Sequence, residues 1–191
     1  MKIRTATIQD AQGIGKVHVD SWRTTYKNII PDSFLDKLSY EQREKLWERN
    51  INREDNYVLV AENEIGETVG FAVASTRETN VERNSSDLTS IYLLEEYQGK
   101  RIGKLLLKEL FMYFKQKGYQ SIFVEVLAEN KTRLFYEYYG AEYVKTVQIN
   151  IGGKVLEEYV YVWNDIDRVL EQLNRDYDQP FDIQNNSHHG L

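Results

Sequence analysis

The sequence predicts one α/β domain of the α+β type, with a mixed, mostly antiparallel central sheet flanked by helices. Three observations predict this class. The segments follow the order β, α, α, β-β-β, α, β, α, β-β; short turns join two of the strand pairs; and neither an internal repeat nor a linker divides the 191 residues. We therefore expect about seven strands in a single domain over residues 1–175, followed by a polar, flexible tail at 176–191.

The first part of the chain combines one short strand with helices. Residues 1–6 have a strand pattern, and the segment Thr7–Asp10 is a capping box opening a helix that we expect to loosen near Ser21. The pair Pro31-Asp32 predicts the start of a short helix, and the segment Ser39–Gln42 is a second capping box for a longer one. The strands that follow would pack against these helices.

From residue 57 onward, apolar segments predict strands at residues 57–61, 69–74, 88–94, 121–127, 144–151 and 155–163. Turn residues at 63–67 and the pair Gly152-Gly153 predict hairpins, and the polar segment 76–86 predicts a loop. Helices are expected at 99–117 and 131–139, each stopped by a following glycine, and at 165 to about 174.

Composition excludes several classes of function. The formal net charge is −6, so we do not expect a nucleic-acid binder, which needs a basic face. Apolar runs are only a few residues long, so the sequence predicts no transmembrane span, and it starts with no apolar signal region. The absence of cysteine excludes disulfides, thiolate metal ligands and a cysteine nucleophile, and it fits a cytoplasmic protein.

The most informative segment is the glycine-containing stretch from Tyr97 to Lys104, between an expected strand and an expected helix. A helix begins with unpaired N–H groups and the positive end of its dipole, so phosphate is a natural ligand there. The spacing does not fit a Walker A loop, because too few residues separate Gly99 from Gly103 and no Ser or Thr follows Lys104. The three glycines of a dinucleotide fingerprint are also absent. The segment predicts a phosphate-binding loop of another kind.

The stretch Gln98-Gly99-Lys100-Arg101-Ile102-Gly103 resembles the Q/R-x-x-G-x-G/A loop of the GNAT superfamily of acetyl-CoA-dependent N-acetyltransferases. The segment Asn130–Ala141 resembles the family's N-x-x-x-x-x-F/Y-Y-x-x-x-G-F pattern, and the resemblance extends over residues 3–163. The segment Trp22–Pro31 is similar to a bacterial subgroup with a W-x-x-x-Y-x-x-x-x-P signature. One position departs, since Arg101 stands where the family usually has glycine; this is compatible with the loop if its φ is negative.

The resemblance implies a GNAT fold with splayed fourth and fifth strands, and acetyl-CoA as cosubstrate without a metal. The pyrophosphate would lie on the glycine loop, and the pantetheine arm would pair with the fourth strand like an added strand. A backbone N–H near Leu93 would polarise the thioester carbonyl. The implied cofactor-binding residues are Ile91, Tyr92, Leu93, Gln98, Gly99, Lys100, Arg101, Ile102, Gly103, Lys104, Asn130, Tyr136 and Tyr139.

The chemistry that the resemblance implies is attack of a neutral amine on the thioester, with no covalent enzyme intermediate. Tyr136 matches the family's tyrosine general acid, which protonates the leaving thiolate, and Tyr139 is the alternative. Two carboxylates compete for the role of general base: Asp87, which opens the fourth strand, and Glu125, which lies in an apolar strand where an unpaired carboxylate is costly. The sequence leaves this choice open.

The acceptor pocket is expected near the first two helices, where Trp22 and Tyr26 would form an aromatic wall for a cationic amine or simply pack the helix junction. The predicted function is acetyl transfer from acetyl-CoA to a primary amine, with a small amine preferred. The alternatives are an acyl-CoA-binding regulatory module of the same fold, a transferase for another acyl group, and a transferase for a protein amine. A homodimer through residues 144–163 is a candidate assembly.

Overall fold

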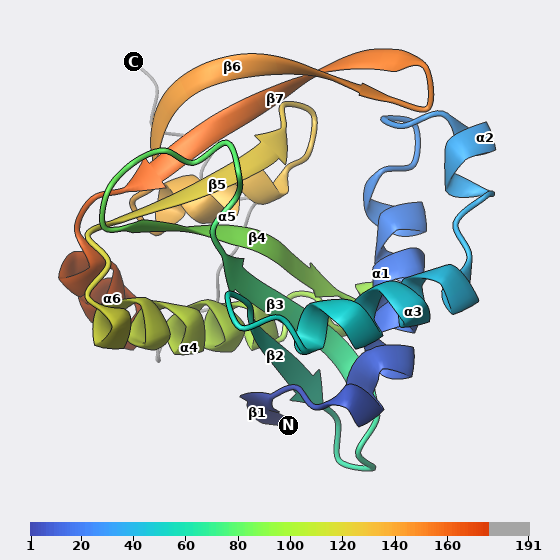
Figure 1. The fold of residues 1–191 in the computed structure, drawn as a ribbon, viewed down its shortest axis with the longest axis horizontal. Helices are drawn as coiled ribbons and strands as arrows, with labels where there is room; N and C mark the ends of the chain where they lie inside the picture. The colour runs from blue at the N-terminus through green and yellow to red at the C-terminus, as the bar shows by residue number, and fades with distance from the viewer. Residues whose placement is uncertain (176–191) are drawn as a thin grey trace.

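The computed structural model describes residues 1–175, which form a seven-stranded sheet with helices on both faces (Figure 1). The strands are β1 (Lys2–Thr5), β2 (Tyr57–Glu62), β3 (Thr68–Ser75), β4 (Ser85–Leu93), β5 (Ser121–Leu127), β6 (Glu142–Ile151) and β7 (Lys154–Trp163). The helices are α1 (Ala11–Thr25), α2 (Asp32–Leu35), α3 (Tyr40–Ile51), α4 (Ile102–Lys117), α5 (Thr132–Tyr138) and α6 (Ile166–Arg175), with short 3-10 helices η1 (Ile8–Asp10) and η2 (Glu95–Tyr97). The tail expected at 176–191 lies outside the described residues.

The strand order is β1-β2-β3-β4-β5-β7-β6, and the fold class predicted from the sequence is confirmed. Adjacent strands are antiparallel except β4 and β5, which run parallel and pair only from Ser85 opposite Ser121 to Leu88 opposite Val124. Beyond Leu88, no strand in residues 1–175 pairs with this edge of β4, while β5 stays paired with β7. The two strands therefore diverge in the middle of the sheet, which is the predicted splay.

An apolar layer covers each face of the sheet. Helices α4, α5 and α6 pack on one face, in a core that contains Phe111, Phe114 and Trp163, and α1 and α3 pack on the other face against Phe71. These four aromatic side chains are fully buried, and each stabilises the fold by about 1.5–3 kcal/mol relative to an exposed side chain. Within the described chain, no helix combines the length and apolar character needed to cross a bilayer.

Most predicted element boundaries agree with the structure to within a few residues, and two differences are informative. Helix α1 does not loosen near Ser21 but continues to Thr25, and within it the buried Ser21 hydroxyl donates a hydrogen bond to the Val17 carbonyl one turn earlier. Strand β4 starts at Ser85, inside the segment predicted as a loop, because its first residues pair in parallel with Ser121 and its neighbours on β5. Local propensity does not report this tertiary pairing.

The β6–β7 hairpin reaches across the molecule to the α1–α2 region (Figure 1). Its turn contains Gly152 and Gly153, both with positive φ, and Gly152 lies against the Phe34 side chain of α2. Beside the turn, the Lys154 ammonium donates to the Ile29 carbonyl at 2.8 Å. The hairpin tip therefore covers the outer side of the loop that follows α1.

This contact predicts unequal effects of two adjacent substitutions. Gly153→Ala should lower the free energy of unfolding by about 1–2 kcal/mol, because an L residue is strained at φ +86° although nothing lies within 4 Å of its new Cβ. Gly152→Ala carries a similar strain at φ +61°, and its Cβ would lie 2.8 Å from the Phe34 Cβ, which adds about 1–3 kcal/mol of overpacking. Urea unfolding of the two variants measures the difference, and equal losses would contradict the contact.

Candidate active site

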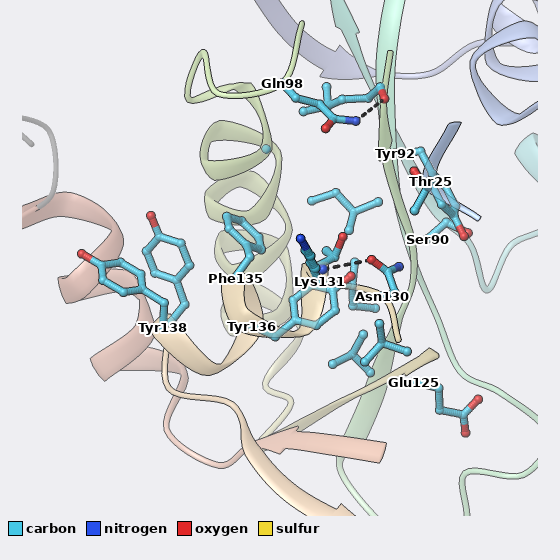
Figure 2. Close-up of a pocket in the computed structure, with 18 of the residues that line it drawn as sticks. Thr25, Ser90, Tyr92, Gln98, Glu125, Asn130, Lys131, Phe135, Tyr136 and Tyr138 are labelled. Carbon is cyan, nitrogen blue, oxygen red and sulfur yellow. Dashed lines mark hydrogen bonds between the residues drawn. The ribbon is translucent and has the colours of Figure 1, made fainter. Parts of the chain in front are cut away.

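A cavity of about 570 Å³ occupies the gap between the diverging strands β4 and β5. It extends from the Gln98–Lys104 loop, along β4, to the end of α1 at Thr25 and Tyr26. Figure 2 shows Phe135 and Tyr136 on one side of β4, and Thr25, Tyr92 and Glu125 on the other. The cavity thus connects the two faces of the sheet.

One end of the cavity is the glycine loop and the first turn of α4. Gly99, Arg101 and Gly103 line it, and the first helical backbone bond runs from the Leu105 N–H to the Arg101 carbonyl. The N-terminal end of a helix carries the positive end of the helix dipole, so this end of the cavity suits an anion. Lys104 also lines the cavity and is only 8% exposed, an unusual burial for a lysine.

The backbone at Arg101 does not meet the condition under which the departure from glycine would carry no strain. Its φ is +64°, so the residue is in the left-handed conformation and its φ is not negative. This is the conformation that glycine adopts without a Cβ penalty, which explains why a glycine is usual at this position of the loop. Arg101 takes the same conformation at a cost of about 1–2 kcal/mol.

Two other residues predicted for the loop are placed differently from Gly99 and Gly103. The Lys100 ammonium lies 5.2 Å from the centre of the Tyr97 ring, and the Ile102 side chain is buried in the core beneath α4. Neither side chain is among the residues that line the described cavity.

The β4 edge forms one wall of the cavity. Ile91, Tyr92 and Leu93 line it in the stretch where the strand has lost its partner β5. Gln98 folds back from the loop, and its side-chain amide donates to the Leu93 carbonyl at 3.3 Å (Figure 2). Backbone groups of an unpaired strand edge can hydrogen-bond an extended ligand in the same way as an added strand.

Helix α5 provides the opposite wall with Tyr136 and Tyr139. Asn130 fixes the start of this helix, since its side-chain oxygen accepts from the Thr132 N–H at 2.9 Å (Figure 2). The Tyr136 ring is 5% exposed and packs edge-on against Trp163 at 5.7 Å. Burial raises the pKa of Tyr136 well above its ordinary value, so this phenol stays protonated and able to donate a proton.

Tyr26 and Tyr92 form a hydroxyl pair at the α1 end of the cavity, with their oxygens 3.1 Å apart. Burial raises the pKa of both phenols, so both are neutral. The Trp22 indole packs edge-on against Tyr26 at 5.0 Å but is not among the residues lining the described cavity. Of the two predicted wall residues, the structure therefore places Tyr26 at the cavity and Trp22 behind it.

His18 is stacked on the outer side of Tyr92, with ring centroids 6.0 Å apart. Its Nδ1 accepts a hydrogen bond from the Trp47 indole at 3.1 Å. Burial lowers the pKa of His18 to about 3, and the charge of Arg43 adds to this effect. The imidazole is therefore neutral at physiological pH and supports the aromatic packing behind the cavity.

The two carboxylates that competed as bases lie in different environments. Glu125 lines the cavity, and its Oε2 is 3.2 Å from the Arg77 Nε. Asp87 is 2% exposed, is not among the lining residues of the described cavity, and accepts from Arg77 N, Arg77 Nη1 and Asn80 Nδ2 at 3.0, 3.2 and 2.9 Å. The geometry favours Glu125 over Asp87 for any contact with a ligand.

Sequence reasoning did not select several residues that the structure brings to this region. Thr25, Ile29 and Ser90 line the cavity, and Arg77 lies beside it with its guanidinium on Glu125. The Tyr92 side chain was also missed, because only its main chain was expected to contribute. Arg77 lies in a polar loop whose sequence gives no signal of a position across the β4–β5 gap.

Comparison with known proteins identifies the class. The family model described as "Acetyltransferase (GNAT) family" matches residues 19–140, more than half of the chain. The chain is 38% identical over 173 residues to the "Uncharacterized N-acetyltransferase YuaI" of Bacillus subtilis (strain 168), covering 91% of this chain and 98% of that protein. The chain therefore belongs to the GNAT acetyltransferase family and is an N-acetyltransferase.

Two further comparisons agree with this assignment. The chain is 28% identical over 120 residues to a spermidine N(1)-acetyltransferase of Thermoplasma acidophilum (strain ATCC 25905), covering 62% of this chain and 73% of that protein. It also superposes on the crystal structure of a ribosomal-protein-alanine N-acetyltransferase from Brucella melitensis, with a TM-score of 0.70 and 26% identity, covering 86% of this chain and 100% of that one. The names of these two proteins give different acceptors.

The left-handed backbone at Arg101 predicts that Arg101→Gly raises the free energy of unfolding by about 0.5–1 kcal/mol. The substitution removes about 1–2 kcal/mol of strain and loses about 0.5–1 kcal/mol to the greater freedom of glycine in the unfolded chain. Lys100→Gly is the matched control: Lys100 is not among the described residues with positive φ, so this change should lower the free energy of unfolding by about 0.5–1 kcal/mol. Thermal and urea unfolding measure both, and a destabilised Arg101→Gly would contradict the assigned strain.

Proposed function

We propose that the protein transfers the acetyl group of acetyl-CoA to a small primary amine by direct attack in a ternary complex. The observation that carries this proposal is the continuous cavity, which joins a phosphate-type helix start to Tyr136, Tyr92 and Glu125 through the gap in the sheet. A long cosubstrate with phosphates at one end and a thioester at the other fits such a passage.

The cosubstrate would enter from the α4 side. Its pyrophosphate would accept hydrogen bonds from the N–H groups between Gly99 and Lys104, with Lys104 adding charge. Its pantetheine arm would pair with the β4 edge at Ile91 and Leu93, replacing the missing β5 partner. Gln98 would then exchange its present bond to the Leu93 carbonyl for the ligand.

The chemical step requires a proton for the departing thiolate. Tyr136 is the proposed general acid, because it lines the cavity and its raised pKa keeps it protonated at neutral pH. The reference pKa values of a phenol and a thiol are about 10 and 8.5, and burial raises the pKa of Tyr136 further above that of the thiol. Tyr136 would therefore donate its proton only as negative charge develops on the departing sulfur. A backbone N–H near Leu93 would stabilise the oxyanion of the tetrahedral intermediate.

The amine would approach from the α1 side, past Tyr26 and Tyr92. Glu125 is the proposed acceptor-side carboxylate, which attracts a cationic amine and takes its proton directly or through water. A small acceptor is favoured because the hairpin tip at Gly152 and Lys154 covers the loop after α1 beside this end of the cavity. The spermidine enzyme of Thermoplasma acidophilum, by its name, also acts on a small amine.

The direct test is an acceptor screen that follows release of free CoA thiol from acetyl-CoA. The panel contains diamines and polyamines, amino-acid derivatives, aminoglycosides, and peptides with free N-terminal or lysine amines. Turnover with small amines above the peptide rate supports the proposal. Binding of acetyl-CoA without thiol release across the panel would contradict catalysis, and faster turnover of peptides would contradict the small acceptor.

The role of Tyr136 predicts a difference between two neighbouring tyrosines. Tyr136→Phe should lower kcat by roughly 10²-fold or more, because the proton donor is lost, while the Kd for acetyl-CoA changes by less than about twofold. Tyr139→Phe is the matched control: Tyr139 lines the same cavity but is not the proton donor of the proposal, so this variant should keep kcat. Calorimetry and thiol release measure the two constants. Unchanged kcat in Tyr136→Phe, or a greater loss in Tyr139→Phe, would remove Tyr136 as the acid.

A further inference from the structure

The carboxylates of Asp87 and Glu125 meet on the two sides of one guanidinium, that of Arg77. We propose that Asp87 is a positioning residue, which acts on turnover only through Arg77 by holding it against the acceptor-side carboxylate of Glu125. The inference rests on the proposed function of Glu125. It joins Asp87 in the paired part of β4, Arg77 in the β3–β4 loop and Glu125 on β5, just past the last β4–β5 pair at Leu88 and Val124.

The first step is the attachment of Arg77 to Asp87. Both the backbone N–H and the Nη1 of Arg77 donate to the Asp87 carboxylate, at 3.0 and 3.2 Å. Asn80 donates to the same carboxylate at 2.9 Å, so three donors surround a side chain that is 2% exposed. A buried carboxylate with these partners fixes both the main chain and the side chain of Arg77.

The second step is the reach of Arg77 to Glu125. The guanidinium is planar and rigid, so fixing its Nη1 on Asp87 also sets the direction of its Nε. That nitrogen lies 3.2 Å from Glu125 Oε2. Arg77 therefore transmits the position of the buried Asp87 to a carboxylate at the cavity.

The third step concerns the charges around Glu125. Glu158 of β7 lies on the same face of the sheet, since it pairs with Leu127, two residues along β5 from Glu125. Burial raises the pKa of Glu158, the Glu125 carboxylate raises it further, and Arg77 opposes this rise. Arg77 thus offsets the repulsion between two neighbouring carboxylates, and losing its position would let Glu125 move away from Glu158.

A purely structural role for Asp87 makes a different prediction. In that case Asp87 would only close the loop at residues 76–84, and its loss would act on stability and on turnover independently of Glu125. In the proposed arrangement, Asp87 has no influence on turnover once Glu125 cannot act as a carboxylate. A double-mutant cycle separates the two, because Asp87 and Glu125 communicate through a shared partner.

The experiment compares Asp87→Asn, Glu125→Gln and the double variant by thiol release from acetyl-CoA, using the panel amine that turns over fastest. Asp87→Asn should lower kcat/KM for the amine roughly tenfold through misplacement of Glu125, with the Kd for acetyl-CoA unchanged. In the Glu125→Gln background, the same substitution should change kcat/KM less than about twofold. The inference would be overturned if Asp87→Asn changed kcat/KM by the same factor in both backgrounds, or if it had no effect on kcat/KM.

The outcomes also separate this inference from the function on which it rests. Normal turnover in Glu125→Gln would contradict the proposed role of Glu125, and the inference with it. Suppose instead that Glu125→Gln reduces turnover, but Asp87→Asn changes kcat/KM by the same factor with and without Glu125. That result would contradict only the inference.

Two further measurements test the inference in case Asp87→Asn folds poorly. The cycle is repeated with Arg77→Gln in place of Asp87→Asn, and the same lack of additivity with Glu125→Gln is expected. A crystal structure of Asp87→Asn should show the Arg77 Nε more than about 4 Å from Glu125, beyond ion-pair contact. An unchanged Arg77–Glu125 pair in that structure would overturn the inference.

Discussion

The divergence of β4 from β5 after Leu88 is the constraint on which the rest of the structure depends. Buried backbone groups must find hydrogen-bond partners, so a gap in the middle of a sheet is stable only where a ligand, water or side chains can satisfy the strand edge. In this protein the gap is lined by the β4 edge, by α5 and by the loop before α4. A sheet with all strands in contact would have no passage between its two faces.

Each side of this passage has its own chemistry. On the α4 side are the N-terminal end of a helix and a buried lysine, Lys104, which suit an anion. On the α1 side, the neutral phenols of Tyr26 and Tyr92 and the carboxylate of Glu125 suit an amine. Tyr136 lines the same cavity on the other side of β4 from Tyr92 and Glu125 (Figure 2), and its burial keeps its proton in place. The proposed transfer requires both sets of groups to meet in one cavity.

The sequence was sufficient for the fold and for much of the cavity wall. Gly99, Gly103, Asn130 and Tyr136 lie in segments that resemble the motifs of the GNAT family, and this resemblance implied their places at the site, while turn, cap and helix rules predicted only the elements that carry them. The sign of φ at Arg101 could not be predicted, because residue type indicates the usual cost of a left-handed backbone but not whether the loop imposes it. Arg77 could not be predicted, since its role depends on two ion pairs across strands that are distant in the sequence.

The most direct test of the central claim is a crystal structure of the protein with bound acetyl-CoA. We expect the pyrophosphate on the N–H groups between Gly99 and Lys104, the pantetheine arm along the β4 edge at Ile91 and Leu93, and the acetyl group near Tyr136. A cosubstrate bound outside the gap between β4 and β5, or an acetyl group remote from Tyr136, would contradict the account.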